Sequence, residues 1–433
     1  MSHRSSALCG WGCAFVLMIL LTPSRASAIP AFARKYGLRC TACHEAWPAL
    51  NDFGRAFRDN GYQLLQGKDT PTTTDPGYLP LSLRLTPHYE FNMATHQPTD
   101  QGTKTLTSGG VSDIGLDLLL AGTLFDNVSF LVVPTGFASD GRVTLESAWV
   151  RFSNLGGSSW ANVKLGQHEV DLPRSEHRSW SLSPNGYLIY GYHSPGSASV
   201  SDLGENQRGI EWAGHDRGSF TRAAVSVFTV EGSPGTRGAF DTPGIYAHVT
   251  HQWLFAGDGV SAFRIGGFGS YTTWPTSILS ANSQPIPGQG SDLKGSSKVG
   301  FDADLWFGPA VTPLHLIIVG AHGQDNKALI PDATRDGTFT GGFLELGYPP
   351  TLKVTVFGRY DAIRNHTQGV PGTPQNFHDE DAETIGLRHS FNLTNRSAYI
   401  LHAEFSTMRT TLAAADGSAM RNNTLFLGID FAF

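Results

Sequence analysis

Charged residues and long apolar runs are both scarce in this chain of 433 residues. Charged side chains make up 16% of the sequence, whereas a typical soluble domain carries about 25%. No apolar run after residue 28 reaches the roughly 20 residues that a transmembrane helix needs, so no helical membrane span is predicted. The formal net charge of -6 argues against nucleic acid as a partner. Because 50 glycines and 26 phenylalanines accompany these absences, extended chain with one apolar face is expected.

Cysteine is also scarce, and its four positions fall into two pairs. The first pair lies in a stretch that begins with a positive charge, continues through a short apolar run over 14–21 and ends in Ala26-Ser27-Ala28. That order is typical of a secretory signal peptide, so residues 1–28 are predicted to be removed on export. Only Cys40 and Cys43 then remain, which is too few for a disulfide framework.

The pentapeptide Cys40-Thr41-Ala42-Cys43-His44 is the most specific motif of the chain. Two thiols separated by two residues and followed by an imidazole form the attachment pattern of a c-type haem. The sulfurs become thioethers on the porphyrin, and the histidine becomes an axial ligand of the iron. A thioredoxin-like redox pair would need a βαβ context, and a zinc site would need further ligands, but the next histidine is His88. The motif therefore predicts one covalent haem c held by Cys40, Cys43 and His44.

Residues 29–67 are predicted to form the monohaem cytochrome segment, and the Pro/Thr-rich stretch 68–78 a linker. The segment contains apolar residues at helical spacing, with Pro48 suited to the first turn of a helix and Gly61 to its end. That apolar face of the helix would either cover the edge of a haem or pack on the rest of the protein, and both explanations stay open. Basic residues near the motif are candidates either for pairing with the haem propionates or for a solvated face, namely Arg34, Lys35, Arg39, Arg55 and Arg58.

The motif supplies one axial ligand of the iron, and the sequence leaves the other open. No histidine or methionine lies between His44 and His88. The candidates are therefore His88, His96 or a loop histidine, Met93, or an open or water-filled position. Because the type of ligand shifts the potential of a haem by on the order of hundreds of millivolts, both directions of electron flow stay open.

From residue 79 to the end of the chain, apolar and polar residues alternate in runs of about ten. For example, Val299 and Phe301 share one face of a run whose other face carries Asp302. Alternation of this length is typical of membrane-spanning β-strands with an apolar outer face and a polar lumen. The predicted strands are 79–93, 111–124, 128–134, 143–152, 160–168, 207–213, 219–230, 245–255, 261–273, 298–307, 312–322, 339–347, 351–361, 383–391, 396–407 and 423–433.

Short and long connections alternate between these strands, as in outer-membrane barrels with short periplasmic turns and long outer loops. The predicted fold class is therefore all-β, a transmembrane antiparallel β-barrel of about 16 strands over 79–433, with a short N-terminal α-helical haem segment. A soluble β-sandwich or propeller is the alternative, but no repeat of blade length is visible. An even strand number places both ends in the periplasm. The long loops are predicted at 94–110, 169–206, 274–297, 323–338, 362–382 and 408–422.

Polar residues on the other face of the strands are predicted to line the lumen, either as ordinary porin lining or in part to hold the haem segment or guide cations. Two acidic loop clusters, from Glu169 to His177 and from His378 to Glu383, would concentrate a divalent cation such as ferrous iron if both loops face outward. Solvated acidic loops are the alternative. The predicted lumen residues are Asp113, Asp117, Glu146, Asp302, Asp304, Arg388, His402, Glu404 and Asp430.

Four elements follow one another within about 35 residues: Pro30–Gly37, the haem motif, Pro48–Phe57 and Gly61-Tyr62. In this order they resemble the fused monohaem cytochrome–porins of bacterial outer membranes. The barrel region is similar to that family in architecture. The resemblance implies an outer-membrane electron-transfer protein, and the best-known members of the family oxidise extracellular ferrous iron.

A haem motif and a barrel on one chain predict an electron conduit. The resemblance implies an extracellular donor, with ferrous iron as the first candidate, and a periplasmic carrier such as a cytochrome or a cupredoxin as acceptor. The protein would then be an iron:cytochrome c oxidoreductase whose haem segment is periplasmic or inside the lumen of a barrel in outer-membrane lipid. The alternatives are a haem-plugged diffusion porin and a barrel sleeve for a separate multihaem cytochrome. No catalytic nucleophile motif, phosphate loop or nucleotide fingerprint supports a hydrolase or a transferase.

Overall fold

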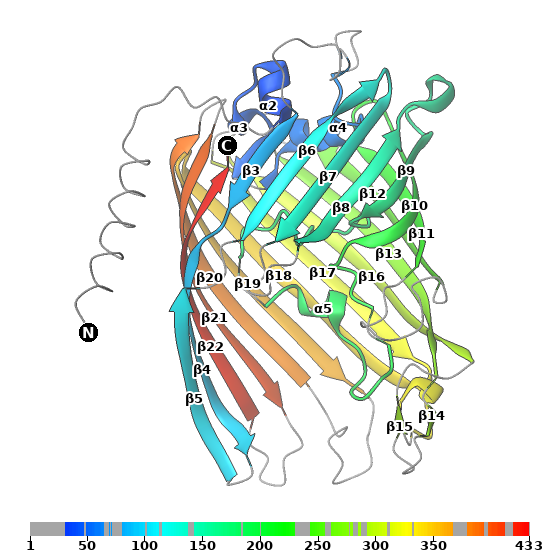
Figure 1. Cartoon of the computed structure of the whole chain (residues 1–433), viewed down its shortest axis with the longest axis vertical. Coiled ribbons are helices and arrows are strands. Elements are labelled where there is room, and N and C mark those ends of the chain that lie inside the picture. The colour runs from blue at the N-terminus through cyan, green and yellow to red at the C-terminus, as the bar shows by residue number, and fades with distance from the viewer. Residues whose placement is uncertain are drawn as a thin grey trace, which may run out of the picture.

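The chain folds into a β-barrel with a small helical segment in one end (Figure 1). The structure is a computed structural model that describes residues 31–46, 49–64, 69, 71, 80–99, 102–111, 115–136, 143–182, 185–199, 201–229, 243–255, 261–276, 278–279, 285–286, 292–309, 312–330, 333–366, 379–393, 397–411 and 419–432. The predicted signal peptide, most of the predicted linker, and Pro48, Asp113 and His378 lie outside these residues. None of the helices in the described part of the chain is long and apolar enough to cross a lipid bilayer.

Antiparallel strands build the wall of the barrel. They are β3 (Leu81–Leu85), β4 (His88–Thr99), β5 (Gly102–Val111), β6 (Leu116–Phe125), β7 (Val128–Gly136), β8 (Val143–Phe152), β9 (Asn162–His168), β10 (Gln207–His215), β11 (Thr221–Thr229), β12 (Pro243–Leu254), β13 (Ala262–Pro275), β16 (Leu293–Phe307), β17 (Leu314–Asp325), β18 (Gly337–Thr351), β19 (Val354–Asn365), β20 (Asp379–Leu393), β21 (Ala398–Thr411) and β22 (Ala419–Ala432).

The first and last strands of the wall close the cylinder. β22 pairs with β4 along most of its length and with β3 at its end. Strands β3 and β4 share one wall position and β5 and β6 share the next, because β3 pairs with β6 and β4 pairs with β5. Counted in this way, the described strands form a closed barrel of 16 positions. Closure leaves no free sheet edge around most of the wall, which is the requirement for a sheet in lipid.

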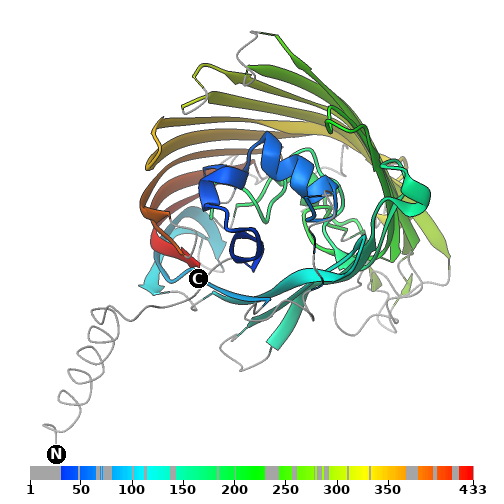
Figure 2. The same cartoon turned by 90° about the horizontal axis from the view of Figure 1, so that it is seen from above.

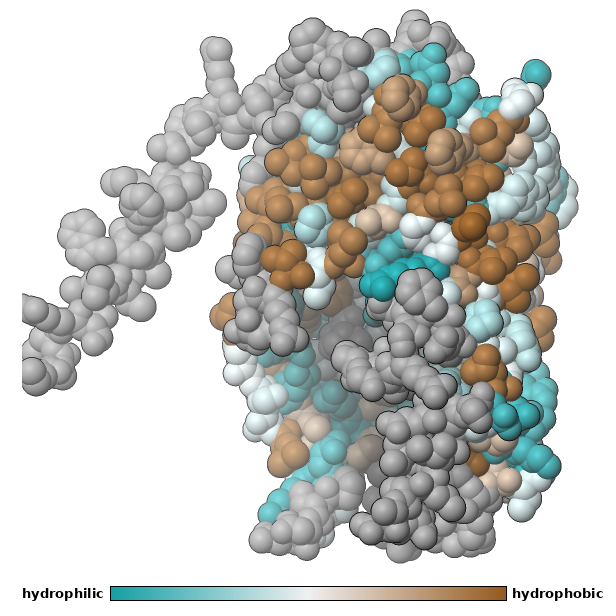
Figure 3. Space-filling model, turned by 45° about the vertical axis from the view of Figure 1, so that its right-hand side comes forward, coloured by the Kyte–Doolittle hydropathy of each residue, from teal (hydrophilic) through white to brown (hydrophobic). Residues whose placement is uncertain are grey.

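The outer surface of the wall is apolar and its inner surface is polar. In β16, Val299 and Phe301 are 62% and 55% exposed, whereas the neighbouring Asp302 is 1% exposed. Figure 3 shows apolar side chains gathered over the upper half of one face of the wall, with more polar side chains below. This is the arrangement of a barrel in a bilayer. The predicted fold class, an antiparallel barrel of about 16 strands with a short N-terminal helical segment, is confirmed.

The predicted loop 94–110 is wrong, because β4 and β5 run through it and are separated by only a two-residue connection. All residues of β5 are exposed, so neither face of this strand needs to be apolar. Without a buried face the alternation that marks a strand is lost, although the backbone ladder continues. Strands β20, β21 and β22 also extend beyond their predicted bounds at the end with the long connections.

The N-terminal segment (residues 31–64) holds short helices and one small strand pair. Its predicted helix begins at Asp52 and not near Pro48, because Asn51 is the N-cap. The predicted stop at Gly61 is confirmed, since Gly61 has a positive φ of 70° one residue after the C-cap Asn60. The elements are α2 (Ala31–Tyr36), α3 (Cys40–Cys43), β1 (His44–Ala46), β2 (Ala49–Leu50) and α4 (Asp52–Asp59). Outside this segment and the wall lie α5 (Leu188–Gly191), β14 (Ile278–Leu279), β15 (Pro285–Ile286) and two 3₁₀ turns at Leu155–Gly157 and Lys327–Leu329.

The longest connection, 169–206, folds into the lumen and is not an outward loop, so that prediction is wrong. Seen along the barrel axis, it lies inside the ring of strands (Figure 2). Its aromatic run around α5 explains this position, because an outward loop would leave these side chains in water. The buried cluster that it forms with the wall contains Tyr187, Ile189, Tyr190, Phe228, Tyr246, Phe268, Phe339, Phe343 and Ile363.

Charged and aromatic contacts hold the N-terminal segment in the end of the barrel that carries the short turns. The buried carboxylate of Asp59 lies 2.7 Å from Arg222 Nε at the start of β11. Although burial alone would raise the pKa of Asp59, the charges of Arg222 and Arg58 hold it below its ordinary value. Arg151 of β8 donates hydrogen bonds to the carbonyl oxygens of Arg58 (3.1 Å) and Asp59 (2.5 Å). The ring of Tyr62 stacks on Trp149 at 6.0 Å, so the segment closes this end as a plug.

Substituting Gly61 tests this docking. A Cβ at Gly61 would overlap the Ser153 hydroxyl of the wall and would also force a positive φ on alanine. We expect Gly61→Ala to weaken the docking by about 1–3 kcal/mol and to speed hydrogen exchange of α4 amides. Gly37→Ala is the matched control, because Gly37 also has a positive φ but open space around its Cβ position. Equal exchange rates in α4 for the two variants would contradict the docked arrangement.

Candidate functional site

The two cysteines of the haem motif lie on one helical turn. Cys40 and Cys43 are the ends of α3, and residues three apart in a helix share a face. His44 leaves the turn in extended backbone, with φ -118° and ψ 132°, and its N–H donates to the Cys40 carbonyl. The local fold therefore presents two sulfurs side by side, with the imidazole on the next residue.

Helix α4 packs directly on this turn. The Asn51 side chain accepts a hydrogen bond from the Gly54 N–H at 2.8 Å and donates one to the Ala42 carbonyl at 3.0 Å. A Cβ at Gly54 would overlap the carbonyl oxygen of Cys43, so only glycine allows this approach. Phe57 of α4 is 6% exposed and makes an edge contact with Phe32 at 5.7 Å. The motif is thus supported on one side by a capped helix and an aromatic cluster.

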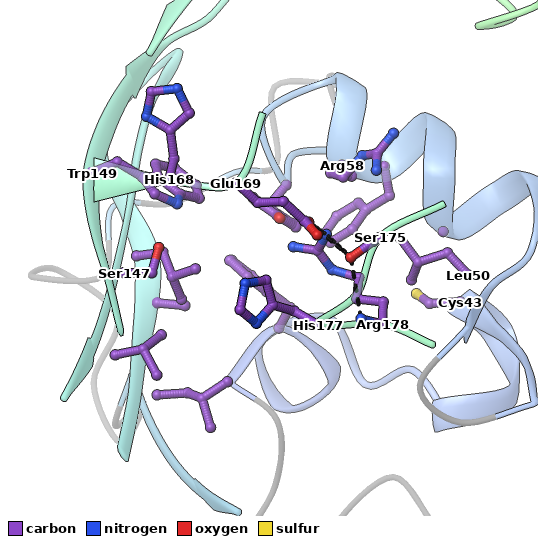
Figure 4. Close-up of a pocket in the computed structure, with 18 of the residues that line it drawn as sticks. Cys43, Leu50, Arg58, Ser147, Trp149, His168, Glu169, Ser175, His177 and Arg178 are labelled. Carbon is purple, nitrogen blue, oxygen red and sulfur yellow. Dashed lines mark hydrogen bonds and ion pairs between the residues drawn. The ribbon is translucent and has the colours of Figure 1, made fainter. Parts of the chain in front are cut away.

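The motif faces a cavity of about 330 Å³ between the N-terminal segment and the barrel wall (Figure 4). Cys40, Cys43 and His44 all line it. The wall contributes apolar side chains from β6, β7 and β8, and the inward connection 169–206 contributes polar ones. Its lining includes Leu50, Phe57, Tyr62, Leu119, Leu131, Val133, Glu146, Trp149, His168, Glu169, Ser175, His177, Arg178 and His215.

The two cysteines of the motif lie away from water, with Cys40 buried and Cys43 half-buried. Burial raises the pKa of both thiols to about 11. Within the described residues, no three His, Cys, Asp or Glu side chains are grouped so that they could hold a metal ion. Two sulfurs and an imidazole at the border of a largely apolar cavity, whose lining also carries charged side chains of both signs, are compatible with a haem c.

Two of the five basic residues named from the sequence reach the cavity. Arg39 and Arg58 line it. Arg34 donates to the Leu81 carbonyl of the wall, and Lys35 donates to the hydroxyl of a wall threonine. Arg55 pairs with a neighbouring aspartate in α4 and lies 4.4 Å from the ring centre of a wall tryptophan. The last three therefore dock the segment and do not face the cavity.

The predicted lumen residues that the structure describes do lie on the inside of the barrel. They form a buried charge network, in which Asp430 pairs with Arg84 at 3.0 Å and with Arg388 at 2.7 Å. Asp117 and Glu146 line the cavity beside the haem motif. The buried members are Asp302, Asp304, Arg388, His402, Glu404 and Asp430.

The two acidic clusters do not face outward as loops. Glu169 pairs with Arg178 at 3.0 Å and Asp171 pairs with Arg222 at 2.8 Å, both inside the barrel. Asp381 belongs to β20 and pairs with a neighbouring arginine at 2.7 Å. The prediction of an outward loop is therefore wrong for the first cluster, which lies inside the barrel, and the described part of the second cluster belongs to strand β20; Glu176 and Glu380, one from each cluster, line a common cavity.

A second, acidic cavity was not predicted. It measures about 720 Å³ and lies between α5, the connection around it, and the ends of β20 and β21 that lead to long connections. Its described lining contains carboxylates but no lysine or arginine. Burial and the nearby charge of Asp202 raise the pKa of Glu176 to about 7. The carboxylates are Glu176, Asp202, Glu205 and Glu380.

Fold and interior together define a class, a closed 16-stranded barrel of the porin type with a plug in one end and a connection folded into its lumen. Solved porins have the same architecture. An anion-selective porin from Comamonas acidovorans matches with a TM-score of 0.53 and 14% identity, covering 82% of this chain and 99% of that one. OprB from Pseudomonas putida matches with a TM-score of 0.50 and 12% identity, covering 81% and 94%. Comparison with family models and with curated proteins finds no match.

Asn51 offers a test of how the motif is supported. Asn51→Ala removes both the helix cap and the hydrogen bond to Ala42, and we expect it to destabilise the packing of α3 on α4 by about 1–2 kcal/mol. Asn51→Asp keeps the cap but loses the donor, so its effect should be smaller. Hydrogen exchange of the α4 amides measures both variants. An Asn51→Ala protein as protected as the wild type would contradict this role.

Proposed function

We propose that this chain is a bacterial outer-membrane cytochrome–porin that carries electrons between an extracellular donor and a periplasmic carrier through one covalent haem c. The observation that carries the proposal is that Cys40, Cys43 and His44 line a cavity whose opposite side is the barrel wall. A haem attached to this motif would therefore lie within the mouth of the barrel. The porin fold supports a location in the outer membrane.

Each element of the site has a role in this proposal. Cys40 and Cys43 would anchor the porphyrin, and His44 would provide a nitrogen ligand to the iron. Phe57 and Trp149 cover the site against water from opposite sides, since both line the cavity from α4 and from β8. The haem supplies reversible one-electron chemistry. The chain holds it, limits its access to water, and sets its potential through the ligands and the dielectric around them.

The positions of the two cavities support opposite sides of access for the electron donor and the electron acceptor. Long connections mark the outer side of porin-type barrels, so the acidic cavity would face the outside and the N-terminal segment the periplasm. An acidic cavity attracts cations, which supports ferrous iron as the donor. A cytochrome or cupredoxin could then reach the plugged end from the periplasm.

A diffusion porin closed by its haem segment is the second candidate, and the likeness of the fold to porins favours it. Conductance in planar bilayers that changes with the redox state would support this channel function. Bilayers that stay closed in both states would count against it. A sleeve for a separate multihaem cytochrome fits less well, because the N-terminal segment and the connection 169–206 occupy the lumen between them.

Covalent haem is the first test of the proposal. Protein exported in a host with a complete cytochrome c maturation system should carry one haem per chain that survives denaturation. The variant with both Cys40→Ser and Cys43→Ser should be colourless, while its barrel still shows the heat-dependent gel shift of a folded porin. A folded wild-type barrel without covalent haem would overturn the proposal.

Removing negative charge from the acidic cavity tests whether ferrous iron is the electron donor. We expect the variant with Asp202→Asn and Glu205→Gln to be reduced by ferrous iron about tenfold more slowly at low ionic strength, because the cavity attracts the cation less. Reduction by ferrocyanide, an anion, should not slow. Asp126→Asn is the matched control, since Asp126 is exposed on a short turn at the opposite end. Unchanged ferrous rates would exclude this route while leaving the haem itself untouched.

A further inference from the structure

The inward connection places one histidine, His177, in the cavity beside the haem motif (Figure 4). His177 Nδ1 lies 3.1 Å from Glu146 Oε1. A carboxylate only accepts hydrogen bonds, so Nδ1 carries the proton and the lone pair of the neutral ring is on Nε2. His177 Nε2 is covered by protein and has no hydrogen-bond partner among the described atoms. An imidazole held by a carboxylate at one nitrogen, with the other nitrogen free, is typical of a metal-ligating histidine.

The turn that carries His177 is held in place. Ser175 Oγ donates to Glu169 Oε2 at 2.8 Å and accepts from the Arg178 N–H at 3.1 Å. Arg178 Nη1 lies 3.0 Å from the same oxygen of Glu169. These contacts, drawn as dashed lines in Figure 4, tie the residues on both sides of His177 to one carboxylate. The ring is therefore positioned by the fold and not by a free loop.

The backbone also sets the direction of the side chain of Glu146, the partner of His177. The pairing of β7 with β8 shifts register next to Pro134, so that Pro134 pairs with Leu145 whereas Val133 pairs with Ser147. Glu146 is the extra residue of this β-bulge, and proline, which lacks an N–H, favours such a break. The bulge lets Glu146 and Ser147, neighbours in sequence, both line the cavity. Thr135 Oγ1 lies 3.0 Å from Glu146 Oε2, which leaves Oε1 for the histidine.

Two other histidines line the cavity, but they are built into the wall. His168 and His215 are 1% and 2% exposed, whereas the His177 side chain is 29% exposed. Their Nδ1 atoms bond backbone carbonyls, and their Nε2 atoms, like that of His177, have no hydrogen-bond partner among the described atoms, so the three rings are distinguished by their position and not by their hydrogen bonds. Figure 4 shows His168 beside Trp149 on the wall, whereas His177 lies between the wall and Cys43. The strand residues named from the sequence, His88, Met93 and His96, do not line this cavity.

We propose that His177 is the second axial ligand of the haem iron, with Glu146 as its positioning residue. This inference rests on the proposed function, because it requires a haem on the motif. His44 and His177 then make the haem six-coordinate, with two imidazole nitrogens. The competing role of His177 is a plain ion pair with Glu146, in which the ring carries a positive charge. The pKa of His177 bears on this role: burial alone would lower it, but Glu146 and Glu169 raise it to about 9.

The experiment compares the ferric holoprotein in detergent with His177→Ala by optical and electron paramagnetic resonance spectroscopy. The wild type should be low-spin, and His177→Ala should become largely high-spin while it keeps its covalent haem. Added imidazole should return the variant to the low-spin state, which shows that the protein is folded and lacks only the ligand. His177→Met should be low-spin with a higher reduction potential, because methionine ligation raises the potential.

Matched controls separate the ligand from other effects. His168→Ala and His215→Ala should stay low-spin. Glu146→Ala should stay mainly low-spin but bind cyanide about tenfold more tightly, since a ligand without its supporting carboxylate is easier to displace. Glu146→Gln, which keeps an acceptor, should resemble the wild type. A merely structural ion pair would not move these spectra.

The outcomes distinguish the two proposals. A His177→Ala protein that stays low-spin, or a wild type that is already high-spin, would overturn the ligand assignment alone. A low-spin state lost in His168→Ala or His215→Ala, and kept in His177→Ala, would reassign the ligand. A wild type with no covalent haem would overturn the proposed function, and this assignment with it.

Discussion

Backbone hydrogen bonding in lipid is the constraint on which the rest of this structure depends. No water is available there to satisfy N–H and C=O groups, so a spanning sheet must close on itself. β22 meets β3 and β4 and completes the ring. Closure then fixes which residues point outward and which point into the lumen. Everything that happens inside the barrel, including the docking of the N-terminal segment, is built on side chains whose direction the ladder sets.

A closed ring of this size encloses more space than its own side chains fill, and the chain fills it with two pieces of itself. The connection 169–206 packs aromatic side chains against the inner wall. The N-terminal segment enters from the other end, where Asp59 pairs with Arg222. Removing one partner of such a buried pair costs about 3–5 kcal/mol, so the plug is held by more than shape. Between the two pieces lies the cavity that the haem motif faces.

Much of this architecture is predictable from the sequence. Alternation of apolar and polar residues identified a strand at every wall position, and short turns set their order. The pentapeptide at Cys40 predicts its chemistry without any fold, because covalent attachment needs only local spacing. The end of helix α4 near Gly61 was likewise predictable from local sequence. The barrel and the stop at Gly61 are confirmed because each is encoded by near neighbours in the chain, whereas the haem stays a prediction.

The remaining features depend on contacts between distant residues. Strand β5 is exposed along its whole length and carries no periodic signal, so the hairpin that it forms with β4 was not predicted. The run of aromatic residues around Tyr187 was a sequence signal for the inward fold of 169–206. The sequence allowed a loop histidine as ligand but did not single out His177, because the position of its partner Glu146 depends on a register shift at Pro134. A proline at the end of a predicted strand was the one local hint of that bulge.

The central claim is that this chain holds a single iron porphyrin inside the mouth of a membrane barrel. Anomalous diffraction at the iron edge, from crystals of the exported and folded protein, tests it most directly. The account predicts one iron peak per chain, located in the cavity between residues 40–44 and β8. A folded barrel with no iron peak, or with iron outside that cavity, would contradict it.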